Sequence, residues 1–558
     1  QPVHHECELH LKLDRDGYLF FPGLIDTREI QAARNVIFKQ LRDVDELEDL
    51  LPPIIASGLG LGPLGDAIKD THRPKKDELD IDKLSPAKKR LVTEELIANQ
   101  IGMRQIKRAS KKQSSTSLEL TNLKDQIISR LPFELTESQK NVEQQISADL
   151  ALDQPMMRLL QGDVGSGKTV VAGMAISIAI DSGFQSVLMA PTELLAEQHK
   201  HSLDEWFEPL GIQTGLLKSK LKASEKRLLI ESIASGNCQI IIGTHALFQE
   251  SIKYNNLALV VVDEQHRFGV EQRYSLIKKA THNGIVPHQL IMTATPIPRT
   301  LAMTAYGDLD NSIISELPSG RGEITTLCLS EDKRADVVKK ALREIEKGRQ
   351  VYWVCPLIEE SEEHNRESAE ATYKKLSKEL EGHRIGLVHG KLSVDKKNKA
   401  MSGFKKHDLD LLVATTVIEV GVDVPNASMM IIENTERLGL SQLHQLRGRV
   451  GRGEHESFCV MLYKNPLGET AKQRLEVIRS STDGFYISEK DLELRGPGEI
   501  LGIRQKGVVG LKIADISRDA YLIPKINKVC DQFENNYPEQ SKKLVRRWIG
   551  NQINYRNV

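Results

Sequence analysis

The feature that most constrains the fold of this chain is a series of short apolar runs. Each run is bounded by Gly, Pro, Thr or Asp and is followed by a helical stretch. Between about residues 126 and 316 the runs are MMRLLQ, SVLMA, CQIIIG, LALVVVDE and QLIMTAT. After ELPSGRGE the rhythm restarts with ITTLCLS, QVYWVCPL, RIGLVHG, DLLVATT and SMMIIEN. Uninterrupted apolar runs that alternate with helices are typical of strands buried on both faces of a parallel sheet. The sequence therefore predicts two successive α/β domains.

The remaining residues are predicted to form helices and short connections. Residues 1–25 alternate leucines with polar residues and then turn into an aromatic run, which indicates a short hairpin. From about residue 27 to 108 the pattern is helical, and a Ser-Pro start with late Arg and Lys residues predicts one long helix at its end. Beyond about residue 470 the pattern is helical again, with the glycine-rich stretch RGPGEILGIRQKG. We therefore expect five regions, at residues 1–25, 26–125, 126–316, 317–470 and 471–558.

Composition excludes several classes of protein. With 40% hydrophobic and 27% charged residues, the chain of 558 residues is neither wholly disordered nor fibrous, and its length suits about three or four domains. No run of about 18 apolar residues is present, so no membrane span is expected. The 6 cysteines form no CxxC pair, which indicates a reducing, intracellular location. Basic and acidic residues nearly cancel, at 76 against 77, so any nucleic acid must be bound by local basic patches.

The segment GDVGSGKT lies between an apolar run and a helical stretch, the context that the phosphate-binding pattern G-x-x-x-x-G-K-[ST] requires. Its glycines would let backbone N–H groups face phosphate oxygens at the start of a helix, where the dipole favours negative charge. Lys168 would reach the β- and γ-phosphates, and Thr169 would bind Mg²⁺. The sequence therefore predicts a site for ATP and Mg²⁺ made by Gly162, Asp163, Val164, Gly165, Ser166, Gly167, Lys168 and Thr169.

Two further groups of charged residues fit this site. The apolar run LALVVV ends in Asp263 and Glu264, where one carboxylate can hold Mg²⁺ and its neighbour can orient or deprotonate the attacking water. In the second α/β domain, QLRGRVGR interleaves three arginines with glycines, which would be odd on a solvated helix face. These guanidinium groups, Arg449 and Arg452 among them, are instead expected to reach the triphosphate and stabilise charge on the transferred phosphoryl group.

The motifs resemble those of superfamily 2 helicases. DEQH, TAT and QLRGRVGR look like motifs II, III and VI, and PTELLAEQ, GTHAL and TTVIEVGVDVP look like motifs Ia, Ib and V. Over roughly residues 27–558 the chain is similar to the RecG family of bacterial fork-remodelling DNA translocases, in GDVGSGKT, DEQHRFGVEQR, MTATPIPRTLAMTAYGDLD and DGFYISEKDLELRGPGEILGIRQKG. The resemblance implies two tandem RecA-like motor domains with parallel sheets, a helical N-terminal region and a C-terminal helical hairpin with a loop.

The resemblance also implies roles for individual residues. The positions that match the family's catalytic centre are Lys168, Asp263, Glu264, Arg449 and Arg452, with Thr169 and Asp263 as metal ligands. Gln139, upstream of the P-loop, would read adenine. The positions that would bind DNA or couple it to ATP are Thr192, Thr244, Thr295, Thr416, Arg474 and Gln505. The last two match the family's translocation motif.

By this resemblance the chain would be an ATP-dependent DNA helicase that translocates on duplex DNA and remodels stalled replication forks and Holliday junctions. Its partners would be branched double-stranded DNA and a single-stranded DNA-binding protein; it would act as a monomer in the bacterial cytosol, near the nucleoid, and not at a membrane. RecG proteins also carry an N-terminal OB-fold wedge, of which residues 1–25 would be at most a remnant, so fork preference stays open. Two alternatives remain: another superfamily 2 repair motor, such as a transcription-repair coupling factor, and a non-catalytic nucleotide-binding module.

Overall fold

The computed structural model describes most of residues 47–550, together with the short strands β1 (Lys12–Leu13) and β2 (Leu19–Phe20). The gaps inside the longer range are residues 73–84, 120–121, 219–220, 265–276, 278, 280, 282–283, 295, 299–308, 319–321, 357–361, 391, 416–423, 454 and 496–510. The antiparallel pairing of β1 with β2 confirms the strand pair expected near the start of the chain. The chain divides into two compact units, one built from Gln1–Gln105 with Val509–Asn557 and the other from Ile106–Val508.

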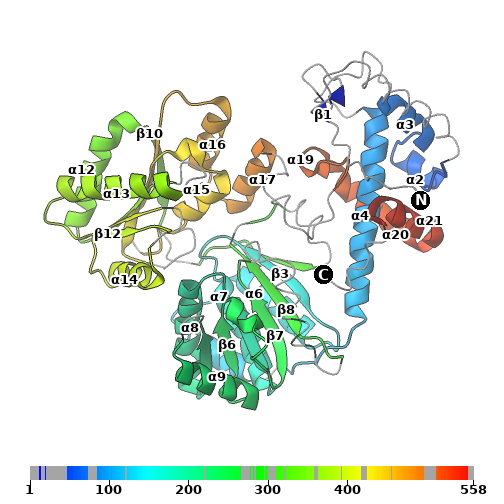
Figure 1. Ribbon diagram of the computed structural model, residues 1–558. Helices are drawn as coiled ribbons and strands as arrows, with labels where there is room; N and C mark the ends of the chain where they lie inside the picture. The colour runs from blue at the N-terminus through cyan, green and yellow to red at the C-terminus, as the bar shows by residue number, and fades with distance from the viewer. Residues whose placement is uncertain are drawn as a thin grey trace, which may run out of the picture. The chain divides into compact units, whose positions relative to one another are not determined.

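The first unit is helical and is built from both ends of the chain. Its helices are α2 (Pro53–Gly58), α3 (Leu64–His72), α4 (Pro86–Lys111), α19 (Ile516–Asp519), α20 (Ile523–Asn536) and α21 (Pro538–Ile549), with the 3₁₀ turn η9 (Ala520–Leu522). Helix α4 is the long helix that the sequence predicts, and Figure 1 shows it as one continuous rod. Its buried residues Leu96 and Ile97 belong to one hydrophobic cluster with Phe533 of α20 and Leu544 of α21. The C-terminal helices therefore share a core with the N-terminal ones.

The second unit contains two parallel sheets. The first has 7 strands in the order β5-β6-β4-β7-β8-β3-β9, and every pair is parallel. Its strands are β3 (Met157–Gly162), β4 (Gln185–Met189), β5 (Thr214–Leu217), β6 (Ile240–Gly243), β7 (Leu257–Val262), β8 (His288–Thr293) and β9 (Asp310–Ile314). The helices around it are α5 (Leu123–Ile128), α6 (Glu137–Leu150), α7 (Lys168–Asp181), α8 (Glu193–Phe207) and α9 (Ala223–Ser235), with the turns η3 (Glu208–Leu210) and η4 (His245–Phe248).

The second sheet has 6 parallel strands in the order β10-β15-β14-β11-β13-β12. Its strands are β10 (Ile324–Ser330), β11 (Gln350–Val354), β12 (Ile385–Val388), β13 (Leu411–Ala414), β14 (Ala427–Ile432) and β15 (Ser457–Tyr463). The helices are α12 (Arg334–Glu346), α13 (Glu362–Glu379), α14 (Val394–Lys405), α15 (Leu440–Arg447), α16 (Glu469–Ser480) and α17 (Gly484–Arg495), with the turns η6 (Glu331–Lys333) and η8 (Thr435–Arg437).

The two sheets confirm the predicted pair of parallel α/β domains, and each apolar run of the sequence contains a strand. Three strands were not predicted. Strands β5 and β9 have weak signals, because β5 is short and contains a glycine and β9 begins with polar residues. Strand β15 (SFCVMLY) is as apolar as the others, so its signal was present in the sequence. Among the described residues, no helix has the length and apolar character needed to cross a membrane.

Candidate active site

Several predicted site residues follow neighbouring strands of the first sheet. Gly162 ends β3, Thr192 and Thr244 come just after β4 and β6, Asp263 follows β7 and Ala294 follows β8. Strands β6, β4, β7, β8 and β3 are consecutive in a parallel sheet, so their carboxyl ends share one edge. Open parallel sheets bind their ligands at that edge. The topology therefore brings the P-loop and the acidic pair together.

The P-loop turns from β3 into α7 through two residues in the left-handed region. Gly165 has a φ of 78° and Gly167 a φ of 85°, values that glycine adopts without a steric penalty. Gly167 is the N-cap of α7, so the loop leads directly into the N-terminus of that helix. These conformations explain why the pattern needs glycine at these places, and phosphate binding by this loop stays a prediction.

Lys168 is buried at the start of α7. Its Nζ donates hydrogen bonds to the backbone oxygens of Gly162 at 2.7 Å and Asp163 at 2.8 Å. Burial lowers the pKa of Lys168, although the nearby carboxylates of Glu264 and Asp263 act in the opposite direction. An ammonium group in such a place is stabilised by an anionic ligand, which suits a phosphate-binding role.

Gln139 connects α6 to the P-loop. Its Oε1 accepts a hydrogen bond from the backbone N–H of Thr136 at 2.9 Å, which completes a capping box at the start of α6. Its Nε2 donates to the backbone oxygen of Ser166 at 2.8 Å. An amide nitrogen has a second hydrogen to donate, so these contacts are compatible with the adenine contact that the sequence predicts, which stays a prediction.

Asp263 is held in place by a residue that the sequence analysis did not single out. The Nε2 atom of His199, on α8, lies 2.8 Å from Oδ2 of Asp263, and Oδ1 accepts the backbone N–H of Glu264 at 3.0 Å. Burial raises the pKa of Asp263, but the hydrogen bond from His199 and the charge of Lys168 outweigh it and lower the pKa below its usual range. The carboxylate is therefore ionised and oriented.

Glu264 differs from its neighbour. Its φ is 50°, a left-handed conformation that is uncommon for a residue with a side chain and that recurs at active sites. Burial, and then the charge of Asp263, raise the pKa of Glu264 to about 7. The backbone N–H of Ala294 reaches its Oε2 at 3.4 Å. A carboxyl group with such a pKa can accept a proton near neutral pH.

Arg447 does not lie where its motif suggests. The arginines of QLRGRVGR were expected to reach the triphosphate, but Arg447 is buried at 2% exposure. Its Nη1 donates to the backbone oxygens of Ile478 (2.6 Å) and Ser481 (2.8 Å), and its Nη2 lies 3.0 Å from Nδ1 of His444. Because these contacts hold its guanidinium group inside the second domain, Arg447 fixes α15 to the end of α16, and the expectation for this arginine was wrong.

Arg449 and Arg452 follow on the glycine-containing turn after α15. Among the charges that act on the acidic pair, Arg449 lowers the pKa of Glu264, after the larger effects of burial, Asp263 and Lys168. Arg452 likewise lowers the pKa of Lys168, although burial and the opposing charges of the carboxylates have larger effects. Arg449 therefore lies within electrostatic range of Glu264, and Arg452 lies within electrostatic range of Lys168. Their role as arginine fingers stays a prediction.

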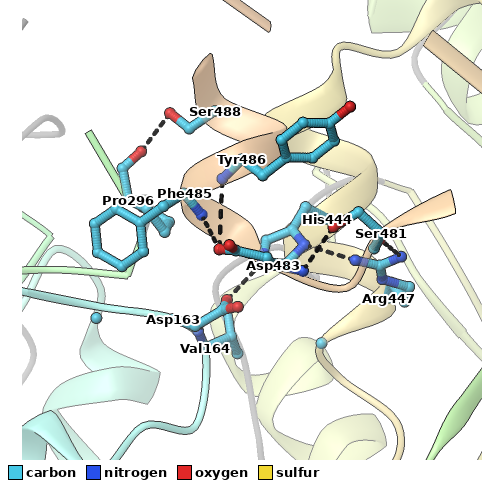
Figure 2. Close-up of polar contacts among 12 residues, drawn as sticks. Asp163, Val164, Pro296, His444, Arg447, Ser481, Asp483, Phe485, Tyr486 and Ser488 are labelled. Carbon is cyan, nitrogen blue, oxygen red and sulfur yellow. Dashed lines mark hydrogen bonds and ion pairs between the residues drawn. The ribbon is translucent and has the colours of Figure 1, made fainter. Parts of the chain in front are cut away.

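The two domains touch at the P-loop. Figure 2 shows the imidazole of His444, on α15, pointing to the carboxylate of Asp163, and the Nε2–Oδ1 distance is 2.5 Å. The same Oδ1 accepts the backbone N–H of Val164 at 2.7 Å. Burial raises the pKa of Asp163, but the hydrogen bonds from His444 and Val164 lower it overall. Like His199, His444 carried no sequence signal that marks it, since histidines on amphipathic helices are common.

The remaining predicted residues are placed as follows. Thr192 caps α8 by accepting the backbone N–H of Leu195 at 3.3 Å, and Thr244 is buried at 3% exposure after β6. Arg474, on α16, donates from Nη1 to the backbone oxygen of Leu438 at 2.8 Å. Thr295, Thr416 and Gln505 lie outside the described residues. Contacts of these residues with DNA stay predictions.

Comparison with known proteins identifies the class that this fold and site define. The model of the DEAD/DEAH box helicase matches residues 139–304, and that of the helicase conserved C-terminal domain matches residues 333–454. The chain is therefore an ATP-dependent helicase. Its P-loop and acidic pair lie in the domain of the first sheet, and the arginine-containing segment lies in the domain of the second sheet. A third model, ATP-dependent DNA helicase RecG, domain 3, C-terminal, matches residues 481–548. The chain belongs to the RecG family of ATP-dependent DNA helicases.

Individual relatives agree with this assignment. The ATP-dependent DNA helicase RecG of Escherichia coli (strain K12) is 51% identical over 524 residues, which cover 93% of this chain and 75% of the relative. The RecG of Bacillus subtilis (strain 168) is 45% identical over 478 residues, 85% of this chain and 69% of the relative. A solved structure of RecG bound to a three-way DNA junction superposes with a TM-score of 0.69 at 39% identity, covering 91% of this chain and 65% of that one.

Proposed function

We propose that this chain is an ATP-driven motor that moves along double-stranded DNA and remodels branched DNA, such as stalled replication forks and Holliday junctions. The observation that carries the proposal is the convergence of Lys168, Asp263 and Glu264 at one sheet edge, with Arg449 and Arg452 supplied by the second sheet's domain. A relative with 39% identity has been solved on a three-way DNA junction, which supports branched DNA as the substrate.

In this proposal ATP lies on the P-loop, with its phosphates over Gly162–Thr169 and Lys168 opposite the β- and γ-phosphates. Thr169 and Asp263 offer hard oxygen donors of the kind that Mg²⁺ prefers, and the ion would neutralise phosphate charge there. Glu264 orients and deprotonates the attacking water, and Gln139 reads the adenine. Arg449 and Arg452 stabilise the charge that develops on the transferred phosphoryl group.

The DNA contacts are proposed for the residues that match the family's DNA-binding and coupling motifs. Thr192, Thr244 and Thr416 would contact the DNA backbone, and Thr295 would link the nucleotide and DNA sites. Arg474 and Gln505 would act in the translocation segment that follows the second sheet. The chain would work as a monomer, with a single-stranded DNA-binding protein as a further partner. The bacterial DNA-processing relatives support a cytosolic location near the nucleoid.

The test compares ATP turnover by the chain without DNA, with linear duplex and with a three-way junction, and follows the junction's conversion into products on a native gel. We expect stimulation of turnover by DNA and ATP-dependent conversion of the junction. Lys168→Ala should abolish both while DNA binding, measured by fluorescence anisotropy, persists. Lys375→Ala, an exposed lysine of α13, is the control and should behave as the unaltered chain does.

Two outcomes would favour the alternatives. ATP turnover on linear duplex without any conversion of junctions would favour another repair motor, such as a transcription-repair coupling factor. Nucleotide binding without turnover on any DNA would favour a non-catalytic module. Equal turnover by the Lys168→Ala variant and the unaltered chain would remove the catalytic assignment altogether.

A further inference from the structure

His444 occupies a junction of three segments that are far apart in the sequence. It is on α15 in the second sheet's domain, it contacts Asp163 after β3, and the first residue of α17, Gly484, packs on both. A Cβ atom at Gly484 would lie 2.7 Å from Nε2 of His444 and 2.9 Å from Oδ2 of Asp163. The backbone of α17 therefore leaves no room for a side chain at this place, and the His444–Asp163 contact is tightly enclosed.

The hydrogen-bond partners determine which ring nitrogen of His444 carries the proton. The Arg447 guanidinium, 3.0 Å from Nδ1, has only donors, so Nδ1 must accept. Nε2 therefore bears the hydrogen and donates it to the carboxylate of Asp163 at 2.5 Å. Arg447 is itself held by the backbone oxygens of Ile478 and Ser481. Figure 2 shows Arg447 beside His444 and Ser481, so the imidazole is held at Nδ1 as well as at Nε2.

The same contact fixes the distance between the P-loop and the arginine-bearing turn. Gly448 directly follows α15, and a Cβ atom there would lie 3.0 Å from Cβ of Val164. The backbone of the turn at Gly448 therefore packs against Val164 of the P-loop, beside the His444–Asp163 hydrogen bond. Arg449 is the next residue, and Arg452 donates from Nε to the backbone oxygen of Gly448 at 3.3 Å. A residue that holds α15 against Asp163 thereby also places both arginines.

We propose that His444 is a positioning residue for ATP hydrolysis, whose hydrogen bond to Asp163 holds the arginine-bearing turn Gly448–Arg452 against the P-loop. The inference rests on the proposed function, because it requires that Arg449 and Arg452 act on a nucleotide bound at the P-loop. His444 does not touch the reacting atoms; it acts through the position of the two arginines. Its loss should therefore slow the chemical step more than it weakens ATP binding.

Two substitutions separate the two hydrogen bonds of the ring. His444→Asn keeps an acceptor at the place of Nδ1, so Arg447 stays paired, but the shorter side chain does not reach Asp163. His444→Gln places an amide N–H near Nε2 and restores the donor to Asp163. We expect His444→Asn to lower kcat about tenfold, with KM within about twofold of the unaltered chain, and His444→Gln to recover most of the loss.

Two further measurements separate positioning from plain stability. The melting temperature of His444→Asn should stay close to that of the unaltered chain, since Arg447 keeps its partners. Asp163→Ala should lower kcat similarly, and adding His444→Asn to it should cause little further loss, because both changes remove one hydrogen bond.

The outcomes distinguish this inference from the function on which it rests. If the unaltered chain shows no ATP turnover, the proposed function fails. If the unaltered chain turns over ATP and His444→Asn matches it in kcat, or raises KM alone, the positioning role is overturned while the function stands. A parallel fall of kcat and melting temperature in both His444→Asn and His444→Gln would also overturn it, since packing would then explain the loss.

Discussion

The imidazole of His199 lies 2.8 Å from the carboxylate of Asp263, so a residue of the helix that follows β4 orients the carboxylate that follows β7. Both side chains are buried, and the contact joins the middle of α8 to the segment that follows β7, the neighbour of β4 in the sheet. Asp263 is proposed to bind Mg²⁺, and a second residue that directs the lone pairs of such a carboxylate fixes the orientation in which it is presented. The acidic pair is thus supported by α8 as well as by its own strand.

His199→Ala should lower the kcat of ATP hydrolysis about tenfold, or about 1.4 kcal/mol in the activation barrier, because Asp263 loses the donor that orients it. The matched control is His201→Ala. His201 lies on the same helix, but its side chain is 64% exposed, so its loss should leave kcat nearly unchanged. Steady-state ATP turnover in the presence of duplex DNA measures both. Similar rates for the two variants would show that His199 does not support the site.

Arg452→Ala should lower kcat by about a thousandfold while KM changes little, since an arginine finger acts mainly on the transition state. Arg479→Ala, an exposed arginine at the end of α16, serves as the control for loss of a positive charge and should keep its activity. Titrating ATP against turnover separates the two constants. A variant with raised KM and normal kcat would mean that Arg452 only binds the nucleotide.

Gly484→Ala should slow ATP turnover about tenfold, because its Cβ atom would collide with Nε2 of His444, Oδ2 of Asp163 and Cγ of Pro296, all within 2.9 Å. Gly468→Ala is the control, since no atom lies within 4 Å of a Cβ atom there and its φ is −67°. The comparison of the two alanine variants in ATP turnover and melting temperature isolates the steric effect. Equal turnover would argue against a role for the enclosed His444–Asp163 contact.

Arg474→Ala should retain much of the DNA-stimulated ATP turnover and lose the conversion of branched DNA. Arg474 donates to the backbone oxygens of Leu438 at 2.8 Å and Glu436 at 3.4 Å, so it joins α16 to the segment that leads into α15. That segment continues into the arginine-bearing turn, so a loosened α16 should transmit less of its movement to DNA.

The control for Arg474→Ala is Lys472→Ala, an exposed cation on the same helix. ATP turnover, junction conversion and melting temperature are to be measured on one preparation. If turnover and conversion fall in parallel with the melting temperature, Arg474 acts as a structural anchor and the coupling role is wrong.

Local patterns in the sequence predicted the two parallel α/β domains and the positions of the groups that are proposed to carry the chemistry. The apolar runs predicted the parallel strands, because strands buried on both faces need continuous apolar residues. The pattern from Gly162 to Thr169 predicted the turn into α7, because left-handed positions such as Gly165 and Gly167 favour glycine. Asp263 and Glu264 could be placed at the sheet edge because they directly follow a predicted strand.

Only the tertiary structure decided which residues support those groups. His444 and Asp163 are 281 residues apart, and Ala514 and Glu95, which pair in the helical unit, are 419 apart. Nothing in the motif distinguishes Arg447 from Arg449 and Arg452. Only the structure shows that the side chain of Arg447 points from α15 to the end of α16, where it is buried. Hydrophobic periodicity indicates which face of a helix or strand is buried, but it does not indicate which residues pack against that face. The partners of His199, His444, Arg447 and Gly484 follow from how the sheets and helices pack, so one sequence alone does not contain them in any local pattern.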